Sequence, residues 1–172
     1  MRTTWFQTSR ARWTFFISAF SLLSAVAHSA TTGNLHLEGR IRQLVSIVVT
    51  SVSPSSSLDL TVSANGLKVA DVQEISNSQT GYRVTLTSAN SGNLRNTSST
   101  GQVIKEISYS ATYDGQAVSL SNSPQEITRY VNSTGQPSSF TKAFNISYVG
   151  SPEESLPSGT YQDDLIFEIA AT

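Results

Sequence analysis

Few side chains of this sequence could do chemistry. Its 172 residues include no cysteine and two histidines, His28 and His36. A Ser-His-Asp triad needs an imidazole held in place by an acid. His36 lies between Leu35 and Leu37, where apolar residues alternate, and a strand sends successive side chains to opposite faces. We therefore interpret His36 as a solvated strand residue, and the sequence offers no catalytic candidate.

Two acidic pairs, Glu153-Glu154 and Asp163-Asp164, are the remaining candidates for binding a metal such as calcium. Adjacent carboxylates on a strand point to opposite faces, and the sequence has no Asp-x-Asp-x-Asp-Gly loop, Cys/His cluster or glycine-rich phosphate loop. We interpret both pairs as solvated turn or edge charges that discourage unwanted strand pairing. The sequence thus predicts no enzyme, no metal and no cofactor.

Residues 1–29 have the pattern of a signal peptide. Three arginines precede the uncharged apolar run at residues 15–27, and cleavage is expected after Ala27 or Ser29. A stable membrane anchor needs roughly 20 apolar residues, so this run is too short for one. We expect a secreted protein.

Removal of this leader leaves an acidic chain. Three of the 11 Lys and Arg residues lie in the leader, so eight remain against 12 Asp and Glu, a net charge of −4. This balance gives no basic footprint for nucleic acid. Roughly 140 residues can form one domain with one core without disulfide bonds.

The rest of the chain is predicted to form short strands rich in β-branched residues, separated by Ser, Asn, Gly and Pro clusters. Asp114-Gly115 predicts a two-residue hairpin loop, and the polar stretches 88–100 and 132–139 are expected to be loops. This pattern favours an all-β antiparallel sandwich and leaves an up-and-down barrel open. The expected strands are 44–52, 58–64, 67–75, 82–88, 103–113, 117–120, 126–131, 139–148 and 160–170.

Three segments of the chain resemble one family. The start, GNLHLEGRI at residues 33–41, resembles the N-terminal extension of chaperone–usher pilins. The stretch LPSGTYQDDL at 156–165 is similar to the LPAGTYSDTL ending of spore-coat-protein-U-like fimbrial subunits. GYRVTLTSAN at 81–90, followed by Tyr113-Asp114-Gly115, is similar to the same group.

This resemblance implies an immunoglobulin-like sandwich, residues 44–172, that lacks its final strand. A periplasmic chaperone would hold it, an outer-membrane usher would assemble it, and the N-terminal extension of another pilin-like subunit, residues 30–43, would complete it. The family's cysteine pair and near-terminal tyrosine are missing here. Carried over by position, the donor side chains are Leu35, Leu37, Gly39 and Ile41, with Gly39 crossing a shallow pocket, and the acceptor edge is Tyr161, Leu165, Phe167 and Ile169.

Two other interpretations remain open at this point. Residues 35–41 could be the first strand of a self-contained sandwich. The chain could also be a secreted module that binds a glycan or a protein through exposed tyrosines. Most of these rings are expected to fill the core instead, and Tyr109 and Tyr113 share one face. The tyrosines are Tyr82, Tyr109, Tyr113, Tyr130, Tyr148 and Tyr161.

The leader hypothesis has a spectroscopic test, because both tryptophans, Trp5 and Trp13, lie within residues 1–29. We expect the exported protein to show tyrosine fluorescence alone. Indole emission from the purified secreted product would mean that cleavage does not occur in this region.

Overall fold

The computed structural model describes residues 32–98 and 105–172. The predicted signal peptide at 1–29 and the beginning of the strand predicted at 103–113 lie outside the described residues. The chain divides into two units, Met1–Gly39 and Arg40–Thr172. In the first unit, residues 32–39 belong to no helix or strand. The second unit holds all the strands that the structure describes.

The second unit is built from strands of two to 13 residues and one 3-10 turn, η1 (Glu153–Ser155). The strands are β1 (Val45–Ser51), β2 (Ala64–Ser76), β3 (Gly81–Ser88), β4 (Asn93–Asn96), β5 (Glu106–Tyr113), β6 (Gln116–Val118), β7 (Gln125–Val131), β8 (Ser138–Tyr148), β9 (Tyr161–Gln162) and β10 (Leu165–Ala171).

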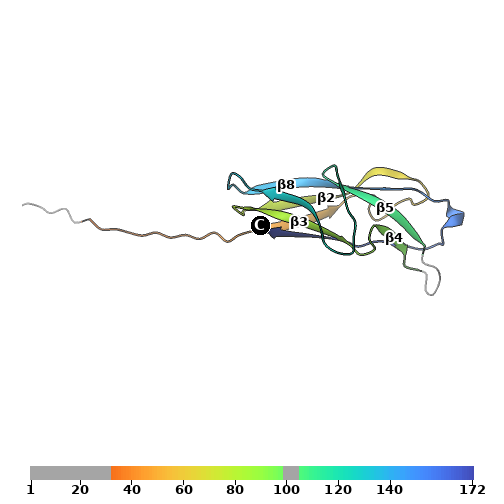
Figure 1. Cartoon of the computed structure of the whole chain (residues 1–172), viewed down its shortest axis with the longest axis horizontal. Helices are drawn as coiled ribbons and strands as arrows, with labels where there is room; N and C mark the ends of the chain where they lie inside the picture. The colour runs from red at the N-terminus through yellow and green to blue at the C-terminus, as the bar shows by residue number, and fades with distance from the viewer. Residues whose placement is uncertain (1–31, 99–104) are drawn as a thin grey trace, which may run out of the picture. The chain divides into compact units, whose positions relative to one another are not determined.

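These strands form two antiparallel sheets (Figure 1). The larger sheet has the order β1-β2-β8-β5-β4-β9, with β6 beside β5, and the smaller sheet has the order β10-β3-β7. The prediction of an all-β antiparallel sandwich is therefore confirmed over the barrel. The hairpin is confirmed as well, since Asp114 (φ 51°) and Gly115 (φ 78°) connect the paired residues Tyr113 and Gln116.

One strand prediction and one loop prediction are wrong in part. The segment predicted as a strand at 58–64 joins β2 only at Ala64. The Asp59 carboxylate accepts hydrogen bonds from the Thr61 backbone N–H (3.0 Å) and the Thr61 hydroxyl (2.6 Å). A side chain that bonds its own backbone two residues on forms a turn in place of a strand. In addition, the stretch 88–100 was expected to be a loop, yet it contains β4.

The predicted last strand, 160–170, is two strands in different sheets. β9 pairs with β4 of the larger sheet, and β10 pairs with β3 of the smaller one. The chain changes sheets at Asp163 and Asp164, which belong to neither strand. This crossing brings the C-terminal strand to the edge of the smaller sheet.

The core lies between the sheets, where strands alternate buried and exposed residues. In β3 the buried set is Tyr82, Val84, Leu86 and Ser88. Asn96 and Asn132, each the first residue of an Asn-x-Ser/Thr sequence, are also buried and donate their amide N–H groups to backbone carbonyls. The buried apolar cluster consists of Val69, Ala70, Val72, Leu86, Leu94, Ile107, Ala111, Tyr113, Phe144, Ile146 and Tyr148.

One charged group, Glu74 of β2, lies at the centre of this core with 0% of its surface exposed. Its carboxylate accepts hydrogen bonds from the hydroxyl of Tyr82 (2.7 Å) on β3 and from the hydroxyl of Tyr113 on β5. The ammonium of Lys142 on β8 lies 3.1 Å away and also donates to the Thr128 hydroxyl of β7 (3.2 Å). This network joins both sheets, because β3 and β7 belong to one and the other three strands to the other.

The two phenols of this network are held in their protonated form. Burial raises the pKa of Tyr82 and of Tyr113 well above the ordinary value near 10, and the hydrogen bond to Glu74 raises both further. The unfolded chain ionises at the ordinary pKa. The stabilisation is thus complete below about pH 10 and is lost as the pH rises toward the folded-state pKa.

Removing either hydroxyl should destabilise the domain. We expect Tyr82→Phe and Tyr113→Phe each to lower the free energy of unfolding by about 1–3 kcal/mol, because a buried acceptor loses its donor. Chemical denaturation measures this change. Tyr130→Phe is the control, since its ring packs on Tyr82 at 5.2 Å and no hydrogen bond of its hydroxyl is found within 32–98 and 105–172. Equal losses in all three variants would contradict the role of Glu74.

Candidate functional site

The two sheets leave one side of the sandwich open between their edge strands β1 and β10. β1 pairs on one side with β2, and β10 pairs on one side with β3. The two edge strands approach each other, but no ladder joins them in the part of the chain that the structure describes. Each strand therefore has a row of backbone N–H and C=O groups free to pair with a further strand.

The inward side chains of these edge strands are only partly covered. Leu165, Phe167 and Ile169 alternate along β10 and are half-buried, and the residues between them are exposed. On β1, Val49 is 46% exposed, although Ile47 packs against the core. A complete sandwich covers such side chains with a neighbouring strand. Here the apolar interior reaches the surface along a seam, which we call the β1–β10 groove.

A cavity of about 220 Å³ opens into this groove. Its lining includes the exposed Val49, the half-buried Leu58, Leu165 and Phe167, and the buried Phe144. Engineered apolar cavities of about 150 Å³ hold a benzene molecule, so this one has room for a large aliphatic side chain. The groove can therefore accept an apolar side chain as well as a strand backbone.

Asp163 lines the cavity of the β1–β10 groove and holds several neighbouring groups in place. The sequence analysis did not predict this role. Its carboxylate accepts hydrogen bonds from the hydroxyls of Ser88 (2.6 Å) and Tyr109 (2.6 Å) and from the backbone N–H of Asn90 (2.8 Å). Burial raises the pKa of Tyr109, and its hydrogen bond to Asp163 adds to the rise. The interpretation of Asp163 as a solvated charge is wrong. Its exposed neighbour Asp164 fits that interpretation.

The predicted acceptor residues are only partly brought together. Leu165, Phe167 and Ile169 line up along β10, whose inward face opens to the groove. Tyr161 lies on β9 in the other sheet, and its hydroxyl donates to the Pro157 carbonyl (3.0 Å). The period of two could not separate them, because Tyr161, Asp163 and Leu165 keep the same half-buried phase through the sheet crossing.

The predicted donor residues lie in a segment without strands. Leu35, Leu37 and Ile41 are 81%, 82% and 89% exposed. A Cβ atom added to Gly39 would meet nothing within 4 Å, so the described chain itself does not require glycine there. His36 is exposed in the same segment. These apolar side chains are thus available to another molecule.

The opposite edge of the smaller sheet, β7, is protected. Arg129 and Glu126 form a bidentate ion pair on this strand, with N–O distances of 2.9 and 2.6 Å. A register irregularity interrupts its pairing with β3, and Lys142 points inward beside Thr128. Charges, bulges and inward-pointing lysines are devices that discourage pairing at an edge. β7 is therefore a poor acceptor compared with the β1–β10 groove.

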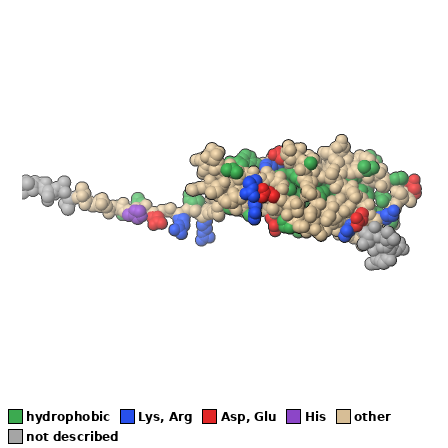
Figure 2. Space-filling view, in the orientation of Figure 1, with side chains coloured by type: hydrophobic (Ala, Val, Ile, Leu, Met, Phe, Trp, Pro, Cys, Tyr) green, Lys and Arg blue, Asp and Glu red, His purple; other side chains and the backbone are tan. Residues whose placement is uncertain are grey.

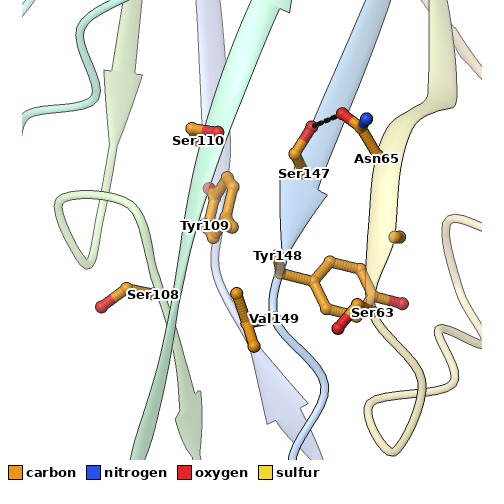
Figure 3. Close-up of a pocket in the computed structure, with 9 residues that line it drawn as sticks. Ser63, Asn65, Ser108, Tyr109, Ser110, Ser147, Tyr148 and Val149 are labelled. Carbon is orange, nitrogen blue, oxygen red and sulfur yellow. Dashed lines mark hydrogen bonds between the residues drawn. The ribbon is translucent and has the colours of Figure 1, made fainter.

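A larger hollow of about 580 Å³ lies over β2, β5 and β8 (Figure 3). Figure 3 shows hydroxyl and amide side chains around it, with Ser147 hydrogen-bonded to Asn65 (3.4 Å). These groups can exchange hydrogen bonds with a ligand, but the lining has no acid or base. Its lining is Ser63, Ala64, Asn65, Ser108, Tyr109, Ser110, Ser147, Tyr148 and Val149.

Surface charge and exposed aromatic rings are two further features by which a protein can recognise a partner. Figure 2 shows a face made mostly of backbone and of side chains that are neither hydrophobic nor charged, with charged side chains in a few small groups. Tyr82, Tyr113 and Tyr148 are buried, and the other three tyrosines are half-buried. The prediction that tyrosines fill the core is confirmed, so they do not form an exposed binding face.

Two absences hold for the described ranges 32–98 and 105–172. No helix there is long and apolar enough to cross a membrane. No group of three or more His, Cys, Asp or Glu side chains there could hold a metal ion.

Comparisons with known proteins find similarity among solved structures. No family model and no curated protein sequence matches the chain. Among solved structures, the chain is similar to the crystal structure of the E. coli Hda pilus minor tip subunit, HdaB. The identity is 15%, the TM-score is 0.38, and the match covers 73% of this chain and 80% of that chain. At this level of similarity, fold and site are inferred from this chain's own residues.

The Asp163 corner can be tested with a neighbouring control. We expect Asp163→Ala to lower the free energy of unfolding by about 3 kcal/mol or more, because three donors lose a charged acceptor. Asp164→Ala should change it by less than about 0.5 kcal/mol, as is usual for exposed positions. Thermal or urea denaturation of both variants measures the difference. Similar values for the pair would show that Asp163 does not hold the sheet crossing.

Proposed function

We propose that this protein is a structural subunit of a fimbria, or of a related surface coat, which assembles by exchange of strands between subunits. In this proposal, residues 35–41 of one subunit enter the β1–β10 groove of the next. The subunit is a structural component and has no catalytic role. The resemblance of residues 33–41 and 156–165 to fimbrial subunits supports the same assignment.

One observation carries the proposal: the chain has both a groove that lacks a strand and a free segment with the side chains of a strand. The groove leaves the inward residues of β10 half-buried. The segment exposes Leu35, Leu37 and Ile41, which alternate with polar residues. Residues 35–41 also match β10 in length, since that strand has seven residues.

The physical gain from this exchange is large enough for a long-lived joint. Leu35, Leu37 and Ile41 would each contribute about 1.5–3 kcal/mol when buried. The backbone of the entering segment would pair with the free edges of β1 and β10, and each hydrogen bond would add a net contribution of about 1 kcal/mol. Gly39 would let the segment cross a shallow part of the groove. No covalent bond between subunits is needed.

The interpretation of residues 35–41 as the first strand of a self-contained sandwich has less support. The described residues 32–44 belong to no strand, and the first strand begins at Val45. The binding-module alternative depended on exposed tyrosines, and these rings face inward or are half-covered. Neither observation favours a second candidate function.

The partners and location follow from the proposed assembly. A subunit with an open apolar groove needs protection before assembly, which a periplasmic chaperone would provide, and an outer-membrane usher would then deliver it to the growing polymer at the cell surface. We infer this route from the family resemblance. The other partners are further pilin-like subunits, of the same or another kind.

Truncation separates the donor from the acceptor. A protein that begins at Gln43 should remain folded and monomeric, because the removed residues form no strand of its own sandwich. It should bind an added peptide GNLHLEGRIRQ, the sequence of residues 33–43, and release it slowly, since pairing extends along the whole strand. Size-exclusion chromatography and surface plasmon resonance measure the two properties.

Two altered peptides serve as controls in this experiment. Gly39→Leu should weaken binding because overpacking a formed groove costs about 1–3 kcal/mol. Leu37→Asp should abolish binding because it would place a charge in an apolar site. A folded truncated protein that ignores the original peptide would exclude strand exchange. A truncated protein that unfolds would instead support the self-contained sandwich.

A further inference from the structure

The base of the N-terminal segment is tied to the sandwich by one side chain, Asn77, in the turn after β2. Its Oδ1 accepts a hydrogen bond from the Leu44 backbone N–H (2.5 Å), and its Nδ2 donates to the Arg42 carbonyl (2.9 Å). The Asn77 backbone N–H donates to the Leu44 carbonyl (3.0 Å). Beside it, Gln43 Nε2 donates to the Ser78 hydroxyl (3.2 Å).

These bonds prolong β1 toward the N-terminus. The last ladder pair of β1 and β2 is Val45 with Ser76. Asn77 and Leu44 continue the pairing by one position, with the asparagine side chain in place of a backbone acceptor. Residues 42–44 therefore continue in the direction of β1. We call this set of bonds the Asn77 clamp.

A chain that carries both donor and acceptor can also close on itself. If residues 42–44 formed a three-residue hairpin loop, residues 35–41 would fold back along the free edge of β1 and enter the chain's own groove. Hairpin loops of this length are common, so chain length alone does not prevent self-closure. The loop would, however, have to release Arg42 and Leu44 from the clamp.

We propose that Asn77 is a positioning residue that keeps the donor segment out of its own groove and so directs it to a second copy of the chain. This inference rests on the proposed strand exchange and adds a residue that decides between polymer and self-closed monomer. The partner that the clamp favours is a second copy, because the bonds at residues 42–44 oppose only the reversal of direction that self-closure requires.

A disulfide trap can measure self-closure, because the natural chain has no cysteine. A three-residue loop at 42–44 places Leu37 opposite Val49, so Leu37→Cys with Val49→Cys forms an internal bond only when the segment folds back. The mature chain with both cysteines is refolded, oxidised at low concentration and separated on non-reducing gels. Internally bonded monomers and chains bonded to each other then appear as different bands.

With Asn77 present, we expect bonds between chains and few internally bonded monomers. Asn77→Ala should raise the internally bonded share by about fivefold, the factor that corresponds to two exposed hydrogen bonds at the weak end of their range. Asn77→Asp keeps an acceptor for Leu44 but loses the donor to Arg42, so its share should be intermediate. It also provides the test if Asn77→Ala does not fold.

The control is Asn93→Ala at the start of β4, where the side-chain amide donates to the carbonyls of Asn90 (3.0 Å) and Ser91 (3.3 Å) in the preceding turn. It should leave the share of internally bonded monomers unchanged. This control distinguishes the loss of the Asn77 clamp from a general loss of stability. If the share of internally bonded monomers is unchanged in the Asn77 variants while disulfide bonds between chains still form, the proposed role of Asn77 is wrong and the strand exchange still stands. If the double-cysteine protein that keeps Asn77 forms no disulfide bonds between chains, and the truncated protein does not bind the peptide, the strand exchange itself is wrong.

Discussion

The sandwich depends on the buried carboxylate of Glu74. A charge without exposed surface is costly unless several donors satisfy it, and here two phenols and one ammonium do so. Those donors come from three other strands, so each strand must reach its place before the charge is satisfied. A shifted register on β3 or β8 would move Tyr82 or Lys142 to the opposite face and leave Glu74 unpaired. The network thus specifies one alignment of the two sheets.

The same network makes the β7 edge of the sandwich different from the β1–β10 groove. Beside β7, the ammonium of Lys142 and the hydroxyl of Thr128 occupy the space between the sheets, and an entering apolar strand would have to bury them. Beside β10, the inward side chains are Leu165, Phe167 and Ile169. An apolar strand therefore gains free energy in the β1–β10 groove and loses it beside β7.

The fold class could be predicted from the sequence because alternation of apolar and polar residues reports directly on burial. Glu74 could have been found by the same rule, since it has the phase of the buried Ala70 and Val72 along β2. The turn at Asp59 and the sheet crossing at Asp163 could not be predicted from the sequence. Both depend on which hydrogen-bond donors the folded chain brings to a carboxylate. Strand periodicity carries no information on such contacts.

The Asn77 clamp also determines how the domain would bear tension. Because residues 42–44 continue the line of β1, a pull on the N-terminal segment acts along that strand and not across it. The hydrogen bonds of an antiparallel ladder lie perpendicular to the strands, so such a pull strains the seven paired positions of β1 and β2 together. A ladder loaded in shear must break as a unit, whereas one pulled apart sideways opens pair by pair. The domain is therefore strongest against a pull along β1.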